Sequence, residues 1–248
     1  MIAVILCAGF ATRMYPLTEN FPKPLLDIGG KSVLDHLIEQ LMEFSNIESV
    51  YVATNNRFFP DFLKWAEERE KHITGKGLSL HIYNDGANQP EERLGATGDL
   101  AFVLRSIEKF EGAVVAAGDN IFTFRLKPYW EEFIKGDRNY ILALKTENIE
   151  RLRRTGVAEL GSGNLVTAFH EKPLDPPSKY ACPALYFLRA DALGLIDEYL
   201  SAPGAADEIG LFISYIAEHS KIYALIAEGE AVDIGTIEAY NRAKSLFG

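Results

Sequence analysis

Two cations follow the first apolar run of the chain, in a loop that also holds several prolines. Residues 6–26 read LCAGFATRMYPLTENFPKPLL, which places Arg13 and Lys23 after a glycine turn. Gly9 permits a tight turn, and the neighbouring backbone N–H groups can then face an anion. Such a loop favours phosphate binding, and the plainer alternative is a surface loop with incidental cations.

Two aspartates and one acid–base pair are the other candidates for chemistry. Asp119 follows the apolar run GAVVAAG, and Asp233 follows a short strand-like segment near the end of the chain. Glu171 and Lys172 lie in the stretch FHEKP. Taken alone, an aspartate at a strand end is more often a turn former or a helix cap. An exposed charged pair stabilises a protein by only about 0–1 kcal/mol.

The elements that must position these residues alternate between strand and helix patterns. Apolar runs predict strands at 2–8, 48–54, 78–84, 112–119 and 139–146, and helical spacing predicts helices at 32–44, 60–71, 97–110 and 127–134. This order predicts an α/β fold with a mainly parallel sheet and helices on both faces. Ligands of such sheets bind at the carboxyl ends of the strands, where Gly9 and Asp119 fall.

The pattern changes after about residue 150. Residues 157–173 predict a hairpin around Gly161-Ser162-Gly163. A strand at 184–188, helices near 190–200 and 207–219, a strand at 221–228 and a last helix from Thr236 follow. No Pro/Gly/Ser-rich linker divides the sequence and no repeat occurs in it. We therefore expect a single domain over residues 1–248.

The composition limits the kinds of partner that the protein can bind. The net charge of −10 argues against nucleic acid or an anionic membrane as the main partner. Cys7 and Cys182 are too few for a disulfide framework and show no metal-ligand spacing. The first apolar run is too short to span a bilayer and has no cationic region before it. We expect a cytoplasmic protein that binds neither nucleic acid nor membrane.

Two common phosphate-binding motifs do not fit. Gly30-Lys31-Ser32 ends like a P-loop, but Leu25 stands where that motif needs its first glycine. No GxGxxG motif follows the first strand, so the dinucleotide-binding fingerprint is absent from the sequence as well.

A collinear set of short motifs resembles one family. The opening LCAGFATRMYPLTENFPKPLLDIGGKSVLDHLIEQL resembles the start of the sugar-1-phosphate nucleotidyltransferases, also called NDP-sugar pyrophosphorylases. The likeness continues through RLGATGDL (93–100), AAGDNIF (116–122), FHEKP (169–173) and AVDIGTIEAYNRA (231–243). These motifs span most of the chain. They imply a Rossmann-like three-layer α/β sandwich with a mainly parallel, mixed sheet.

The resemblance implies a reaction and assigns residues to it. The family joins a nucleoside triphosphate to a sugar 1-phosphate and releases pyrophosphate, by in-line attack on the α-phosphorus without a covalent enzyme intermediate. Two polyanions must meet, so cations and a divalent metal have to offset their repulsion. By resemblance, Arg13 and Lys23 are the catalytic cations, and Asp119 and Asp233 hold Mg²⁺, which suits one or two carboxylates plus phosphate oxygens.

The other implied assignments divide between the two substrates. The residues implied for the nucleotide are Leu6, Ala8, Gly9, Phe10, Ala11, Thr12, Gln89, Gly95 and Asp119, with Gly95 against the base. Gly156, Glu171 and Lys172 are implied for the sugar 1-phosphate, so residues 1–150 form a nucleotide half and 151–248 a sugar-phosphate half. Neighbouring strand residues point to opposite faces, so Glu171 and Lys172 serve one ligand only if the chain bends between them. We expect no C-terminal β-helix.

Three positions depart from the family pattern. Ala11 replaces a glycine and keeps the N–H donor, but its Cβ disfavours a positive φ. Asp99 stands where alanine is common, and Cys182-Pro183-Ala184 replaces a glycine-containing approach to the next strand. The base and the sugar therefore stay open. General likeness favours a pyrimidine triphosphate (dTTP, UTP or CTP) and glucose 1-phosphate, in a polysaccharide-supply role.

Three alternatives remain beside this interpretation. A non-catalytic nucleotide- or sugar-sensing module on the same fold would have lost a metal carboxylate or Lys23, and the sequence keeps them. A glycosyltransferase would carry a DxD motif, of which GDN offers one carboxylate. A nucleotidyltransferase for a non-sugar phosphate such as phosphocholine is the third. We expect an Mg²⁺-dependent nucleotidyltransferase that forms a homo-oligomer.

Overall fold

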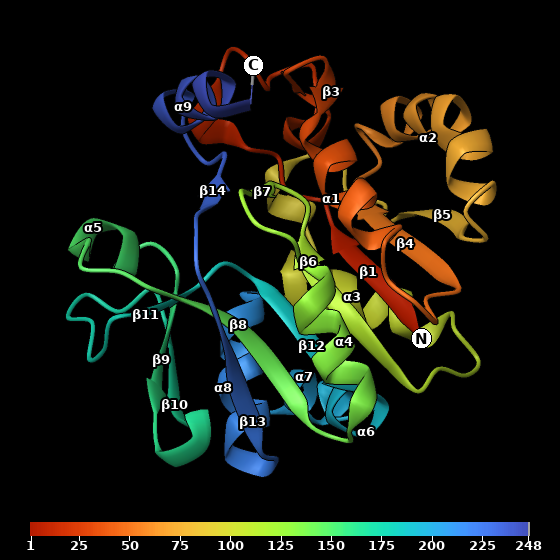
Figure 1. The fold of residues 1–248 in the computed structure, drawn as a ribbon. Coiled ribbons are helices and arrows are strands. Elements are labelled where there is room, and N and C mark those ends of the chain that lie inside the picture. The colour runs from red at the N-terminus through yellow and green to blue at the C-terminus, as the bar shows by residue number, and fades with distance from the viewer. Residues whose placement is uncertain (248) are drawn as a thin grey trace.

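Strands from both halves of the chain join one ten-stranded sheet in the computed structural model, which describes residues 1–247 (Figure 1). Its order is β10-β9-β11-β8-β12-β6-β1-β4-β5, with β13 paired to β8. The first four strands of this sheet in chain order are parallel: β1 (Ile2–Leu6), β4 (Ser49–Thr54), β5 (Ser79–Asn84) and β6 (Gly112–Ala117). The others are β8 (Asn139–Lys145), β9 (Gly156–Leu160), β10 (Val166–Glu171), β11 (Tyr180–Cys182), β12 (Leu185–Arg189) and β13 (Ile222–Ala227). All pairings made by these strands are antiparallel, including that of β12 with β6, except that β13 runs parallel to β8.

Helices cover both faces of the sheet because its strands are apolar on both sides. Ala3 and Ile5 of β1 pack into one core, and Ile2 and Val4 pack into another. Helices α1 (Val33–Leu41), α2 (Phe59–Thr74) and α4 (Lys127–Lys135) contribute to the first core. Helices α3 (Gly95–Arg105), α6 (Ala190–Leu193), α7 (Ile196–Ser201) and α8 (Ile209–His219) contribute to the second. The predicted α/β sandwich with a mixed sheet is confirmed.

Helix α1 begins at a capping box. Asp35 N donates to Ser32 Oγ at 3.0 Å, and Ser32 N donates to Asp35 Oδ2 at 2.9 Å. The buried Asp35 carboxylate also accepts hydrogen bonds from Trp65 Nε1 and from the guanidinium of Arg69, at 2.9–3.0 Å. One carboxylate therefore joins the start of α1 to α2.

The end of the chain returns to the cationic loop near its start. Strand β14 (Ala231–Asp233) pairs antiparallel with β7 (Asn120–Phe122), and helix α9 (Ile237–Phe247) follows β14. A small core joins these segments to the N-terminal loop and to the hairpin of β2 (Asp27–Ile28) and β3 (Lys31–Ser32); its members are Met14, Leu26, Ile28, Val33, Ile121, Val232, Ile234 and Ala243. Figure 1 shows α9 beside the red N-terminal segment, and Tyr240 Oη donates to the Asp27 carbonyl at 2.8 Å.

The predicted hairpin at 157–173 is confirmed as β9 and β10, joined by a short 3₁₀ turn (Ser162–Asn164). The short strand-like segment predicted at Asp233 is confirmed as β14. The sequence did not predict β2, β3, β7 or β11, because strands of two or three residues are too short to show a period. Short helix α5 (Ile149–Leu152) lies between β8 and β9. Across residues 1–247, no helix combines the length and the apolar character that a membrane crossing requires.

Candidate active site

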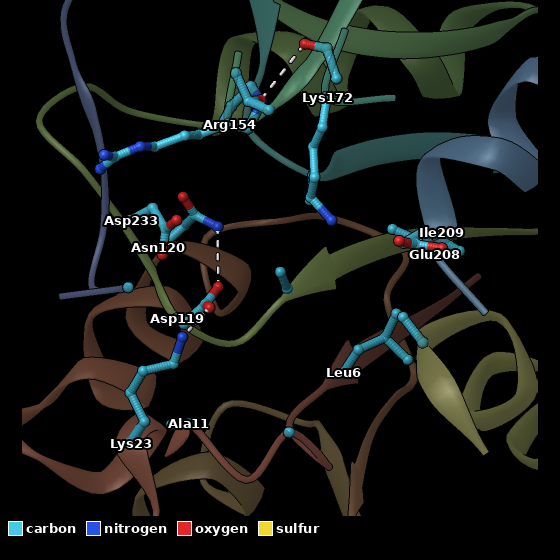
Figure 2. A pocket seen from close by; sticks show the side chains of 18 of the residues that line it. Leu6, Ala11, Lys23, Asp119, Asn120, Arg154, Lys172, Glu208, Ile209 and Asp233 are labelled. Carbon is cyan, nitrogen blue, oxygen red and sulfur yellow. Dashed lines mark hydrogen bonds and ion pairs between the residues drawn. The ribbon is translucent and has the colours of Figure 1, made fainter. Parts of the chain in front are cut away.

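A cavity of about 970 Å³ opens beyond the carboxyl ends of β1 and β6 (Figure 2). Segments that follow these strands line it on one side, and segments around β10, β14 and α8 line it on the other. The sequence-predicted residues that line it are Leu6, Ala8, Gly9, Phe10, Ala11, Thr12, Arg13, Lys23, Gly95, Asp119, Gly156, Glu171, Lys172 and Asp233. The fold thus brings both predicted halves of the site to one cavity.

The turn after β1 leads from the strand to the cation Arg13, which lies in a short 3₁₀ turn (Thr12–Met14). Ala11 adopts the left-handed conformation that its Cβ disfavours, with a φ of +49°. Its carbonyl accepts hydrogen bonds from Met14 N at 2.9 Å and from the buried Thr18 Oγ1 at 2.8 Å, which hold this conformation. At Gly9, a Cβ would meet no atom within 4 Å, so the glycine borders open space.

Lys23 and Asp119 form the centre of the site. Lys23 lies in a second 3₁₀ turn (Lys23–Leu25), and its Nζ forms an ion pair with Asp119 Oδ2, while Asn120 Nδ2 donates to Asp119 Oδ1 at 3.2 Å. The side chain of Lys23 is only 14% exposed. Burial alone would lower the pKa of Lys23, but the charges of Asp119 and Asp233 outweigh it and the pKa is raised. Lys23 is therefore a cation at neutral pH.

The β7–β14 pair brings the second carboxylate to this centre. Asp233 stands opposite Asn120 in the register, and Ile234 N donates to the Asp119 carbonyl at 3.0 Å. Asp233 is exposed to the cavity, and the protein around it displaces part of the water that would surround a free carboxylate. This desolvation, followed by the charge of Asp119, raises the pKa of Asp233 to about 6.

The two carboxylates suit a divalent cation. They present hard oxygen atoms, and their mutual repulsion would be relieved by a positive charge between them. Within residues 1–247, no group of three or more His, Cys, Asp or Glu side chains could hold a metal ion. A cation held by Asp119 and Asp233 would complete its coordination with other oxygen atoms, and Mg²⁺ commonly takes these from water and from substrate phosphates.

Glu171 is the last residue of β10, and the chain bends at Lys172 as a shared ligand requires. Lys172 has a φ of +47°, and its backbone N donates to the Thr155 carbonyl at 3.2 Å. Figure 2 shows the Lys172 side chain pointing into the cavity, and its Nζ lies 3.1 Å from Glu171 Oε1. The Glu171 side chain is 12% exposed, and burial raises its pKa although Lys172 opposes the rise.

At two glycines that were predicted to contact substrates, other protein atoms occupy the space that a side chain would need. A Cβ at Gly156 would overlap the ring of Phe169, lying 2.9 Å from Cε1. A Cβ at Gly95, whose φ is +76°, would overlap Asp207 and lie 2.7 Å from its Cγ. Contacts of Gly156 and Gly95 with substrates stay predictions.

Comparison with known proteins covers nearly the whole chain. Residues 2–247 match the family model described as nucleotidyl transferase. The chain belongs to the nucleotidyl transferase family.

This family member matches only part of the length of two curated relatives. Bifunctional protein GlmU of Methanococcus vannielii is 30% identical over 244 residues, which cover 95% of this chain and 52% of that protein. Glucose-1-phosphate adenylyltransferase of Geobacter metallireducens is 30% identical over 189 residues, 73% of this chain and 45% of that protein. The chain thus spans about half the length of these curated relatives. The structure of UDP-glucose pyrophosphorylase complexed with UDP-glucose has a TM-score of 0.81 at 19% identity, over 99% of this chain and 97% of that chain, and it shares the fold.

Gln89 is the predicted site residue that the structure leaves apart from the others. It precedes a 3₁₀ turn (Pro90–Glu92), and its Nε2 donates to Glu92 Oε1 at 2.8 Å. Among residues 1–247, Gln89 does not line the cavity, whereas Asp99 does. Asp99 is buried; burial and then the charge of Asp85 raise its pKa to about 8, so in this family member the carboxyl group is largely protonated at neutral pH.

Sequence reasoning missed several cavity residues of this nucleotidyl transferase. They are Asn120, Arg151, Arg153, Arg154, Asp207, Glu208 and Arg242. The charge run RLRR at 151–154 could have indicated the three arginines of that segment, and Asn120 and Arg242 lie within the motifs AAGDNIF and AVDIGTIEAYNRA. Arg151 Nη2 donates to the Ala231 carbonyl at 3.1 Å, which joins the end of α5 to β14. None of the ion pairs found within residues 1–247 involves Arg13 or Arg154, so both guanidinium groups are available to a bound anion.

Proposed function

We propose that the chain transfers a nucleotidyl group from a nucleoside triphosphate to a sugar 1-phosphate, giving an NDP-sugar and pyrophosphate. One observation carries the proposal: the Lys23, Asp119 and Asp233 cluster shares a cavity with the Glu171–Lys172 pair. The cavity of about 970 Å³ is large for a single small ligand, since such sites span roughly 300–1,000 Å³. Two substrates that must react with each other need this room.

We assign the triphosphate to the side of the cavity formed by the loop that follows β1. Arg13 and Lys23 come from two turns of the same loop, and both line the cavity. Their charges would offset the negative charge that builds up on the leaving pyrophosphate. Because the ion pair with Asp119 holds Lys23 in place before the reaction, this cation needs little reorganisation during the transfer.

The sugar 1-phosphate is assigned to the side formed by β10. The Lys172 ammonium would bind the phosphate, and the Glu171 carboxylate would accept hydrogen bonds from sugar hydroxyl groups. A phosphate oxygen then attacks the α-phosphorus in line, and the bond from that phosphorus to the oxygen bridging the β-phosphate breaks. No general base is needed, since a sugar phosphate is already ionised at neutral pH.

Mg²⁺ is the proposed cofactor, held by Asp119 and Asp233. When bound, it would neutralise charge on the phosphate groups and help to align them. Asn120 would orient the Asp119 carboxylate through its Nδ2 hydrogen bond, and Lys23 would balance the charge of the same carboxylate.

A pyrimidine triphosphate and glucose 1-phosphate are the proposed pair, on general likeness to the family. The names of the relatives include an adenylyltransferase, so the assay must also contain purines. We expect pyrophosphate release with Mg²⁺ when ATP, GTP, CTP, UTP and dTTP are crossed with glucose, galactose, mannose and N-acetylglucosamine 1-phosphates. Phosphocholine serves as the non-sugar acceptor.

Release that requires both substrates, and that EDTA abolishes, would support the proposal. The Asp119→Asn and Asp233→Asn variants should each lose turnover while staying folded. Pyrophosphate release with phosphocholine as the acceptor, but with none of the sugar 1-phosphates, would identify a non-sugar acceptor. Silence with every pair, while triphosphate still binds, would favour the sensing module.

A further inference from the structure

The Glu171 carboxylate lies against the first turn of helix α8. A Cβ at Gly210 would clash with Glu171 Oε2 and would lie 2.6 Å from Cδ and 3.2 Å from Cγ. These three atoms of Glu171 are the nearest to that position. The carboxylate therefore fills the space that any other amino acid would use for its side chain at residue 210.

The backbone does not explain why residue 210 is a glycine. Gly210 is the second residue of α8, is buried, and has no positive φ. Alanine is the better residue within a helix. Only the contact with Glu171 favours a residue without a side chain at this position.

The start of a helix is also a suitable place for a carboxylate. The first backbone N–H groups of a helix have no partner within it, and that end carries a partial positive charge. Glu171 can therefore remain an acceptor in the cavity although burial raises its pKa.

The segment that leads into α8 also contacts the nucleotide side of the cavity. The side chain of Asp207 fills the space above Gly95, and its carboxylate pairs with Arg93 at 3.2 Å. The Asp207 carbonyl accepts a hydrogen bond from Thr97 N at 3.1 Å. Figure 2 shows Glu208 and Ile209, between Asp207 and Gly210, at the wall of the cavity. Four consecutive residues thus connect the start of α3 with the Glu171 carboxylate.

We propose that Gly210 is a positioning residue for the sugar: it leaves the Glu171 carboxylate the room it needs to face the sugar hydroxyl groups, and segment 207–210 fixes that place relative to the nucleotide side. The inference rests on the proposed function and adds a residue to it. Lys172 pairs with Glu171 at 3.1 Å and lies on the same side of the cavity, so a change at residue 210 affects binding of the sugar 1-phosphate and not of the triphosphate.

The first test is Gly210→Ala, assayed by pyrophosphate release. The new Cβ meets only the end of a flexible side chain, so the protein folds and its Tm stays unchanged or rises. The KM for the sugar 1-phosphate rises about tenfold, as expected when hydrogen bonds to a charged group are misplaced, and the KM for the triphosphate stays the same. Gly136→Ala is the matched control, because a Cβ there meets no atom within 4 Å and the φ of Gly136 is −130°.

The second test is the same substitution in a Glu171→Ala background. Once the carboxylate is gone, Gly210→Ala has nothing to displace and adds no further loss in kcat/KM or in calorimetric binding of the sugar 1-phosphate. A full-sized loss in that background, an equal rise in both KM values, or a clear fall in Tm would overturn the inference. If Gly210→Ala has wild-type kinetics, the role of Gly210 is overturned and the proposed function stands. If the wild type and Gly136→Ala are both inactive, the proposed function is overturned as well.

Discussion

Replacement of Lys23 by glutamine removes the cation closest to the two carboxylates. The Lys23 side chain is mostly buried, and Asp119 is its ion-pair partner. Glutamine keeps a similar length and a hydrogen-bond donor, so the change isolates the charge. We expect a large fall in kcat with a fold that persists, since Asn120 still donates to Asp119.

The size of the effect follows from Coulomb's law. A unit charge about 4 Å from the developing negative charge, at an effective dielectric constant of about 20, stabilises it by about 4 kcal/mol. Each 1.36 kcal/mol corresponds to a factor of ten in rate, so kcat should fall by ~10³.

The assay is steady-state pyrophosphate release at saturating substrates, with Tm measured on the same sample. Lys31→Gln is the control, since Lys31 lies close in sequence but pairs with Glu39 at the surface, at 2.7 Å. The control should keep wild-type kcat. A loss of less than about tenfold for a folded Lys23→Gln variant would refute the assigned role, because the worked value is about a hundred times larger.

Two further predictions concern stability and base choice. Asp35→Ala should lower the free energy of unfolding by about 2–4 kcal/mol, because the helix cap and the bonds to Trp65 and Arg69 are lost; urea unfolding measures this. Burial would raise the pKa of Asp35, but the hydrogen bonds to its carboxylate outweigh the effect of burial and the pKa is lowered. The stabilisation by the ionised carboxylate is therefore fully present above the ordinary aspartate pKa. It is lost as the pH falls through the lowered pKa of the folded protein. The deficit of Asp35→Ala should therefore narrow as pH falls below about 4, and a constant deficit would contradict the assigned ion pair. Gln89→Ala should leave the relative kcat/KM for the five triphosphates unchanged, since Gln89 bonds to Glu92 outside the cavity; a changed base preference would contradict this placement.

The sequence predicts those parts of the molecule that local pattern determines. The apolar run at the start of the chain forms the expected strand β1, and α1 begins within one residue of the predicted start at residue 32. Pattern could not predict β7 or its pairing with the short strand at Asp233, β14. These strands have three residues each and are stable because they pair with each other and pack on a small core. The site depends on this pair, since it brings Asp233 opposite Asn120.

Local reasoning also fails where a tertiary contact overrides a backbone preference. Ala11 adopts a left-handed conformation because Thr18 and Met14 bond to its carbonyl, and no local signal indicates these bonds. Gly210 gives no turn signal, and its role appears only when Glu171 is seen beside it. Gln89 shows the converse, since a residue suited to base recognition lies outside the cavity.

The most direct test of the account follows the α-phosphorus itself. The protein is incubated with Mg²⁺, a sugar 1-phosphate and a nucleoside triphosphate labelled at the α-phosphate, and the products are separated. The account predicts that the label moves into an NDP-sugar only when both substrates are present, and that Asp233→Asn abolishes this transfer. Label that appears as free nucleoside monophosphate, or that stays in the triphosphate with every sugar 1-phosphate, would contradict it.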